Sequence, residues 1–342
     1  MAFFPSVRIE GQWAAEDVLA PVRAFLEGVP IPSCGVALGV VTLGKLLGGM
    51  GLSTVEDACR AVAVALMTLL TLRIALCPRG FLRELDSAVT MSVFANYFMT
   101  FVQLSTYMLP VSCALAVTMW VFGVGGHVFL AIAYALRRAS DPRLGDVHTT
   151  WFVCFGGYVV GSVTAPSFGV EAAGLALFWV GFALCLAAAP LVALRYAKVP
   201  VPAASRPTFC IFSAPTSLLL AGYLACASAP DVPFVAALTA LDQVLYLMVL
   251  ARLPSIVRAG FYPSFAAMTF PLASTANTLG QVNVVLSAQG VATGPMAAIA
   301  LAEAAVACVV VAFVAGCYAV LLSQRAIGVL GCMLRQGSQA RS

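Results

Sequence analysis

Long apolar runs recur along the whole chain, and short polar stretches separate them. A helix that crosses a membrane needs about 20 mostly apolar residues. Ten stretches meet this requirement: 32–51, 57–77, 87–105, 108–136, 149–166, 170–194, 208–227, 232–253, 264–287 and 294–322. The fourth and the tenth are longer than a bilayer requires, so we expect them to tilt, bend or extend beyond it. The pattern predicts an all-α polytopic membrane protein with ten transmembrane helices.

Composition supports a membrane protein. Hydrophobic residues make up 62% of the chain and charged residues 9%, against about 25% charged residues in a soluble domain. The first 30 residues are too polar for a signal peptide, and residues 15–27 are a candidate surface helix. We therefore divide the chain into a cytoplasmic N-terminal segment (1–31), a ten-span membrane domain (32–322) and a cytoplasmic C-terminal tail (323–342).

Cysteine and histidine residues give no sign of a metal site or of catalysis. The eleven cysteines are scattered without a C-x-x-C pair, and His127 and His148 have no neighbours at ligand spacing. No nucleophile–base pairing stands out in the spans. The sequence predicts no cofactor, no metal and no enzyme activity. Loop placement explains the net charge of +4 better than nucleic-acid binding does.

The placement of Lys and Arg orients the predicted bundle. With ten spans, both termini and every second connection lie on one side, and that side holds sixteen of the eighteen basic residues. The other side has Arg60 and, within the first span, Lys45. The positive-inside rule then places both termini in the cytoplasm of a cell that carries the protein in its plasma or inner membrane. Short turns on the outer side join consecutive spans into five helical hairpins.

The odd-numbered spans differ in composition from the even-numbered ones. Glycine, proline and polar residues concentrate in the odd spans, whereas the even spans are mostly Leu, Val and Ala. This difference favours odd helices inside, around a central pore, and even helices outside. Close packing of helices through small residues is the alternative explanation for the glycines.

The ninth span, around Pro271, has the most informative pattern. A proline within a helix leaves the carbonyl four residues earlier, on Ala267, without its partner, and lipid cannot satisfy that carbonyl. At helical spacing, Phe270, Ser274, Asn277 and Gln281 share one face, which small residues continue on the other side of Phe270. The pattern indicates either a kinked packing helix or a pore-lining helix with one aromatic constriction.

Three charged residues lie at least five residues from either end of a predicted span. An intramembrane charge is by default a candidate functional residue. Lys45 either attracts anions near the outer mouth or is paired or extended to the interface. Asp242 in the eighth span and Glu303 in the tenth are either neutral or hydrogen-bonded acids at helix contacts, or proton-coupling groups.

Several segments resemble one family in order along the chain. They are residues 30–39 (PIPSCGVALG), 98–100 (FMT), 148–152 (HTTWF) with 162–166 (SVTAP), 206–208 (RPT) with 214–223 (APTSLLLAGY), and 261–271, which ends in MTFP. Together they are similar to the tellurite-resistance/dicarboxylate transporter (TDT) family, which includes the bacterial tellurite-resistance protein A, the yeast malate permease and the plant slow anion channel. Tellurite resistance is a phenotype attached to the family and a poor guide to the substrate.

The resemblance implies five helical hairpins around a pore, a homotrimer with one pore per subunit, and a phenylalanine on the ninth helix that plugs the pore. Phe270 falls at that position. The predicted pore-lining residues are Gly35, Gly39, Phe94, Phe98, Gly157, Gly161, Pro215, Ala267, Pro271, Ser274 and Asn277. The expected partners are membrane lipid and a small inorganic anion or a C4-dicarboxylate such as malate. A passive anion channel and a proton-coupled carrier both remain open.

Overall fold

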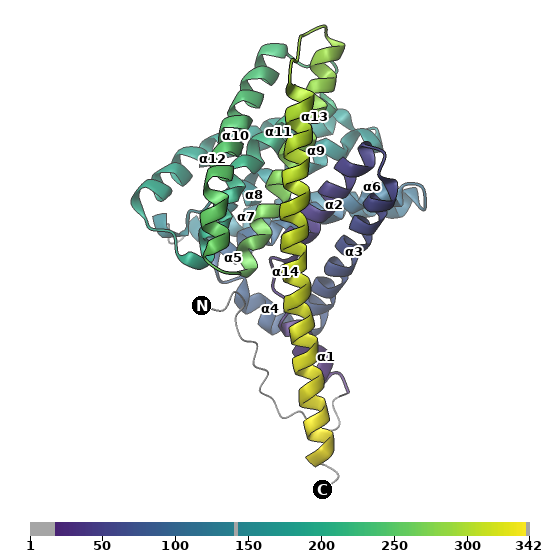
Figure 1. Cartoon of the computed structure of the whole chain (residues 1–342), viewed down its shortest axis with the longest axis vertical. Helices are drawn as coiled ribbons and strands as arrows, with labels where there is room; N and C mark the ends of the chain where they lie inside the picture. The colour runs from purple at the N-terminus through teal and green to yellow at the C-terminus, as the bar shows by residue number, and fades with distance from the viewer. Residues whose placement is uncertain (1–17, 140–142, 340–342) are drawn as a thin grey trace.

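The computed structural model describes residues 18–139 and 143–339, and every regular element in these residues is a helix (Figure 1). Most of the N-terminal segment, including Arg8, and the basic residue Arg341 lie outside the described residues. The structure confirms that the protein is an all-helical membrane protein.

Seven helical segments in the described residues are long and apolar enough to cross a membrane. Five are continuous helices, α3 (Ser53–Leu76), α7 (Cys113–Ala139), α10 (Glu171–Lys198), α12 (Val232–Arg258) and α14 (Met296–Gln339). At 1.5 Å per residue, the 44 residues of α14 extend about 66 Å, roughly twice the hydrocarbon thickness of a bilayer. The lower part of α14 accordingly projects beyond the bundle (Figure 1).

The other two segments are interrupted helices. The fifth predicted span comprises α8 (Thr150–Gly156), the 3-10 turn η2 (Gly157–Val159), α9 (Val160–Thr164) and η3 (Ala165–Phe168). The seventh comprises the 3-10 helix η4 (Ala203–Ser213) and α11 (Ala214–Cys226). Irregular backbone at membrane depth is tolerated where protein or a cavity surrounds it, and most of both segments is buried.

Three predicted spans fall on helices that do not meet the length and hydropathy expected of a membrane span. The first is α2 (Ser33–Gly49), with 17 residues. The third is divided at Phe94 into α5 (Ala88–Val93) and α6 (Ala95–Met108). The ninth is divided into η5 (Pro263–Met268) and α13 (Thr269–Ala288), which carries many hydroxyl and amide side chains.

Pro271 does not kink a continuous helix, contrary to the sequence interpretation. The backbone is a 3-10 helix through Met268, and α13 begins at Thr269, so Pro271 occupies its third position. The first four N–H groups of an α-helix have no partner within the helix, and a proline there loses no helical hydrogen bond.

Helix contacts follow a regular scheme. Helices α2, α6, α9, α11 and α13 contact one another in that order, and α13 returns to α2. The long helices α3, α7, α10, α12 and α14 each pack on one or two members of this group. Residues of α2, α11 and α13 are mostly buried, whereas the long helices expose large apolar side chains such as Phe129, Val244 and Val309.

One end of the bundle is built from basic residues and their partners. The short helix α1 (Ala20–Glu27) contacts α3 and α14 there, and α4 (Pro78–Glu84) follows α3. Arg73, 1% exposed, forms an ion pair with Glu84 and donates to the carbonyl of Val29 at 2.6 Å. Arg137 pairs with Asp86 at the same end. These contacts hold the connecting segments against the bundle.

Candidate functional site

A cavity of about 60 Å³ lies on one side of Phe270. About 10–15 Å³ of such space holds one water molecule, so this cavity has room for a few waters or a small ion. We call it the Phe270 cavity. Its wall is uncharged and consists of Pro32, Gly35, Val89, Thr90, Val93, Asn96, Val153, Thr208, Ile211, Ala214, Ser264, Ala266, Ala267, Phe270 and Pro271.

A second, wider cavity of about 520 Å³ opens further along α13. We call it the Asn277 cavity. It is lined by Leu46, Gly49, Met50, Val163, Leu224, Ala225, Asn277, Gly280, Gln281, Val284 and Val285. Asn277 lies seven residues after Phe270, which corresponds to about 10 Å along the helix axis. Both walls come entirely from the odd-numbered predicted spans.

The segment between the two cavities is closed by Phe270 and by contacts of α13 with its neighbours. The Phe270 side chain is only 7% exposed. One turn later, the hydroxyls of Ser274 and Ser217 are hydrogen-bonded at 3.0 Å, and Thr278 donates to the Ser217 carbonyl at 3.2 Å. Helices α11 and α13 therefore meet directly between the cavities.

On the opposite side, α2 holds the start of α13 in place. The Thr269 hydroxyl lies 3.0 Å from the carbonyl oxygen of Gly35 and 2.7 Å from that of Ala266. A Cβ atom at Gly39 would lie 2.8 Å from the backbone nitrogen of Phe270, closer than real Cβ atoms come. Glycine at this position is what allows α2 to approach the backbone that carries Phe270.

The structure thus brings part of the predicted pore lining together. Gly35, Ala267 and Pro271 share the Phe270 cavity with Phe270, and Asn277 lines the Asn277 cavity. Gly39 and Ser274 lie between the two cavities at helix contacts.

The remaining predicted pore-lining residues line neither cavity. Phe94 and Phe98 stack with each other and with Tyr97. A Cβ atom at Gly161 would meet side chains of α7 and α10, and one at Gly157 would meet Met99 and His127.

Pro215 is in the first turn of α11, next to Ala214 of the Phe270 cavity. Phe94, Phe98, Gly157 and Gly161 therefore make contacts between helices and do not line a cavity.

Lys45 faces α6 and lines neither cavity. Its ammonium donates to the Thr106 hydroxyl at 3.0 Å and lies 5.3 Å from the centre of the Tyr107 ring. The Tyr107 hydroxyl in turn donates to Glu56 at 2.7 Å. Of the two roles considered for this lysine, the geometry favours pairing.

Asp242 and Glu303 are both buried among helices α11, α12 and α14. Their side chains are 2% and 4% exposed. The Thr216 hydroxyl donates to Asp242 at 2.7 Å, whereas neither oxygen of Glu303 has a hydrogen-bond partner.

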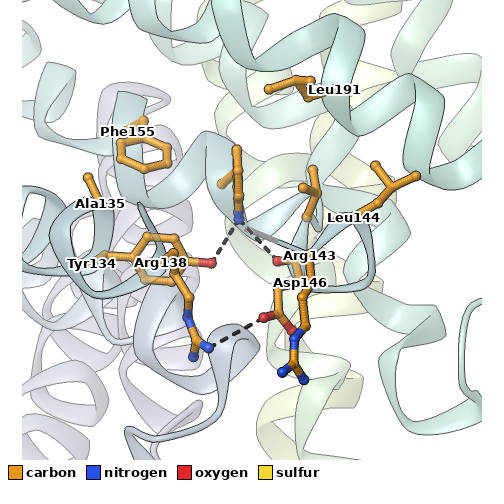
Figure 2. A pocket seen from close by; sticks show the side chains of 10 residues that line it. Tyr134, Ala135, Arg138, Arg143, Leu144, Asp146, Phe155 and Leu191 are labelled. Atoms are coloured by element: carbon orange, nitrogen blue, oxygen red, sulfur yellow. Dashed lines mark hydrogen bonds and ion pairs between the residues drawn. The ribbon is translucent and has the colours of Figure 1, made fainter. Parts of the chain in front are cut away.

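A third pocket, of about 380 Å³, lies at the basic end of the bundle and is lined mainly by apolar and aromatic side chains (Figure 2). The Trp151 indole donates to the Tyr134 hydroxyl at 2.8 Å and to the Asp146 carbonyl at 3.2 Å. Arg138 pairs with the Asp146 carboxylate at 3.4 Å. The network fixes the start of α8 against α7, so Arg138 has a structural role here.

Sequence reasoning missed several polar residues of the site. Asn96 and Thr208 line the Phe270 cavity, and Ser217 and Thr269 bridge helices beside it. Each lies in an odd-numbered predicted span, so the enrichment of polar residues in those spans was the available signal. Which face each residue occupies follows from helix breaks that the pattern does not reveal.

Comparison with known proteins identifies one family. The family model described as voltage-dependent anion channel (SLAC1) matches residues 33–320. A search of curated proteins found no match. The matched range covers both cavities and all the helices from α2 into α14, and it confirms the family resemblance seen in the sequence.

Proposed function

Because the chain belongs to the voltage-dependent anion channel family, we propose that it is a gated pore for small anions in which Phe270 is the gate. The family is one of membrane transport proteins and not of enzymes. The observation that carries the proposal is the position of Phe270 between two uncharged cavities that share the wall of α13.

The proposed pore runs through the centre of five helical hairpins. The closed order of contacts among α2, α6, α9, α11 and α13 supports this arrangement, because each of these helices belongs to an odd-numbered span. The long partner helices would then face lipid or other subunits with their exposed apolar side chains. We propose a homotrimer with one pore per subunit, and light scattering of the purified protein in detergent tests the subunit number.

Weak binding fits the chemistry of the walls. No charged side chain lines either cavity, so an anion would exchange part of its hydration for hydroxyl and amide groups such as those of Asn96, Thr208 and Asn277. A dicarboxylate would need stronger donors for two carboxylates. The proposal therefore favours monovalent inorganic anions over C4-dicarboxylates such as malate.

The mechanism assigned to Phe270 is steric closure combined with dewetting. An aromatic ring that fills the narrowest part of an uncharged pore leaves no space for a hydrated ion. Movement of the ring, or of the α13 turn that carries it, would join the two cavities. We place the basic end of the bundle, and with it both termini, on the cytoplasmic side of the cell membrane.

Anion flux from proteoliposomes tests the gate. Phe270→Ala should raise chloride flux over wild type, and Phe270→Leu should give an intermediate flux. Phe265→Ala is the matched control, because Phe265 lies on η5 one turn away, is buried, and lines neither cavity. Equal low flux in folded wild-type protein and in both Phe270 variants would refute the assignment.

A proton-coupled carrier is the second candidate, and the two buried carboxylates favour it. Such a carrier would show saturable malate uptake that requires a proton gradient. A pore would show non-saturating chloride flux without one. Running both substrates in the same vesicles, with and without a gradient, decides between the two.

A further inference from the structure

Two carboxylic acids are buried together away from the proposed pore. Asp242 is on α12 and Glu303 on α14, both are buried, and Glu303 acts electrostatically on Asp242. No Lys, Arg or His side chain forms an ion pair with either one among the described residues. Burying an ionised carboxylate without a cation is costly, so this arrangement requires an explanation.

The hydrogen bonds of the two acids are unequal. Asp242 accepts one from Thr216 at 2.7 Å. Glu303 has none on either oxygen, although the Gln243 amide approaches it. The Tyr246 hydroxyl, on a side chain only 2% exposed, also lacks a hydrogen-bond partner and interacts electrostatically with both acids. Several buried polar atoms of this cluster therefore lack a hydrogen-bond partner among the described residues.

We infer that Asp242 and Glu303 together form a buried proton-binding site, and that loss of its proton releases the helix that carries Phe270. Two negative charges that interact in this buried environment repel each other with no cation to offset them. A bound proton removes one of these charges, and with it the repulsion and the cost of burying an unpaired carboxylate. The proton is the ligand, and the site would be filled in the closed conformation described above.

Few other titratable groups face the pair. Helix α12 contributes Tyr246, and α14 contributes Glu303 itself, with Cys308 more than a turn away. Helix α13 has no titratable side chain, and those of α11, Tyr223 and Cys226, lie near its far end. The proton equilibrium of the site therefore depends on the two acids and Tyr246.

A short chain of contacts connects the site with the gate. Thr216, the donor to Asp242, is followed on α11 by Ser217, which is hydrogen-bonded to Ser274 of α13. Ser274 lies one turn after Phe270. This step rests on the proposed function, because it assumes that Phe270 is the gate.

The direction of the effect follows from hydration. A deprotonated pair places two negative charges in a buried site among α11, α12 and α14, where no described Lys, Arg or His side chain forms an ion pair with either acid. Conformations that separate these helices hydrate the charge, so deprotonation favours them over the closed packing. We therefore expect alkaline pH to open the pore.

Chloride flux is measured with the same pH on both sides of the vesicle membrane, so that no proton gradient exists. Wild-type flux should rise at least about fivefold between about pH 6 and about pH 9, the lower end of typical coupling between sites. Asp242→Asn and Glu303→Gln should stay at the low, acid-side flux throughout. Glu171→Gln, an exposed acid on α10, is the control and should retain the wild-type response. A response that persists in both Asp242→Asn and Glu303→Gln would overturn the inference.

Two further measurements separate this inference from the gate itself. Phe270→Ala should conduct at all pH values with no pH response; if it conducts no better than wild type, the gate assignment fails. Infrared spectroscopy of the wild-type protein should show a protonated carboxyl band that disappears on alkaline titration and is absent from the Asp242→Asn, Glu303→Gln double variant. If the wild-type band does not titrate, the proton site fails whatever the flux of Phe270→Ala.

Discussion

Substitution of Gly39 by alanine probes the contact between α2 and the gate segment. The added Cβ would lie 2.8 Å from the Phe270 nitrogen and would overlap the Thr269 side chain. Thr269 cannot rotate away freely, because its hydroxyl is hydrogen-bonded to Gly35 and Ala266. The backbone itself must therefore move.

The size of the effect follows from these distances. Ordinary contact begins at 3.4 Å, and the Thr269 Cβ atom lies 2.3 Å from the added Cβ and does not move when the side chain rotates, so α13 must shift by 3.4 − 2.3, or about 1.1 Å, relative to α2. Overpacking of this kind costs about 1–3 kcal/mol, which exceeds the gain of up to about 1 kcal/mol from replacing glycine by alanine in a helix. Gly49 is the matched control on the same helix, because a Cβ there has nothing within 4 Å.

Thermal unfolding in detergent and chloride flux are the assays. Gly39→Ala should unfold at a lower temperature than wild type, whereas Gly49→Ala should unfold at the same or a slightly higher temperature. Flux through Gly39→Ala should also change, because the shift occurs at Phe270. If Gly39→Ala is as stable as Gly49→Ala, α2 and α13 are not in the close contact on which the closed gate depends.

Three further variants test groups outside the cavities. Burial and the nearby Arg195 lower the pKa of His148 from 6.5 to about 4, so between these pH values the unfolded chain binds a proton that the folded chain does not. The melting temperature should therefore fall as the pH drops from about 6.5 to about 4. It should fall less in the His148→Asn variant. Arg73→Gln should lower the free energy of unfolding by about 2 kcal/mol in denaturant titrations, because it removes a charged donor from the buried Val29 carbonyl. Arg79→Gln, at an exposed position, should not lower it. Lys45→Met should lower the melting temperature but leave flux per folded protein unchanged, and a loss of flux in fully folded protein would contradict its assignment as a paired residue.

The sequence predicted the helical elements well, because apolar length is a local property. All ten predicted spans coincide with helical segments in the described residues. It did not predict where the helices break. Residues 263–281 have the pattern of one kinked helix, yet the backbone changes from 3-10 to α-helix at Thr269. Local hydropathy does not distinguish these two helix types.

The same limitation explains the mixed outcome for the pore lining. Phe270, Ser274 and Asn277 lie within the uninterrupted helix α13, so a helical residue count applies to this segment. Gly157 is the first residue of η2 and Gly161 follows it in α9. In a 3-10 helix 3.0 residues per turn replace 3.6, so the angular position of each residue changes there. A helical count through that segment cannot tell which side faces a cavity.

Sequence spacing could not identify the hydrogen-bond partners of the charged residues inside the spans. Lys45 donates to a residue 61 positions away, and Asp242 accepts from one 26 positions away. Both partners come from other helices, so no local pattern identifies them. The hydrogen bond of Lys45 to Thr106 favours its interpretation as a paired residue of a helix contact. Glu303 differs from both, since its two buried carboxyl oxygens accept no hydrogen bond within the part of the chain that the structure describes. A group that is costly in the closed conformation and could be hydrated in another is the kind of group that makes a conformational equilibrium depend on pH, and for that reason Glu303 deserves the first substitution outside the pore.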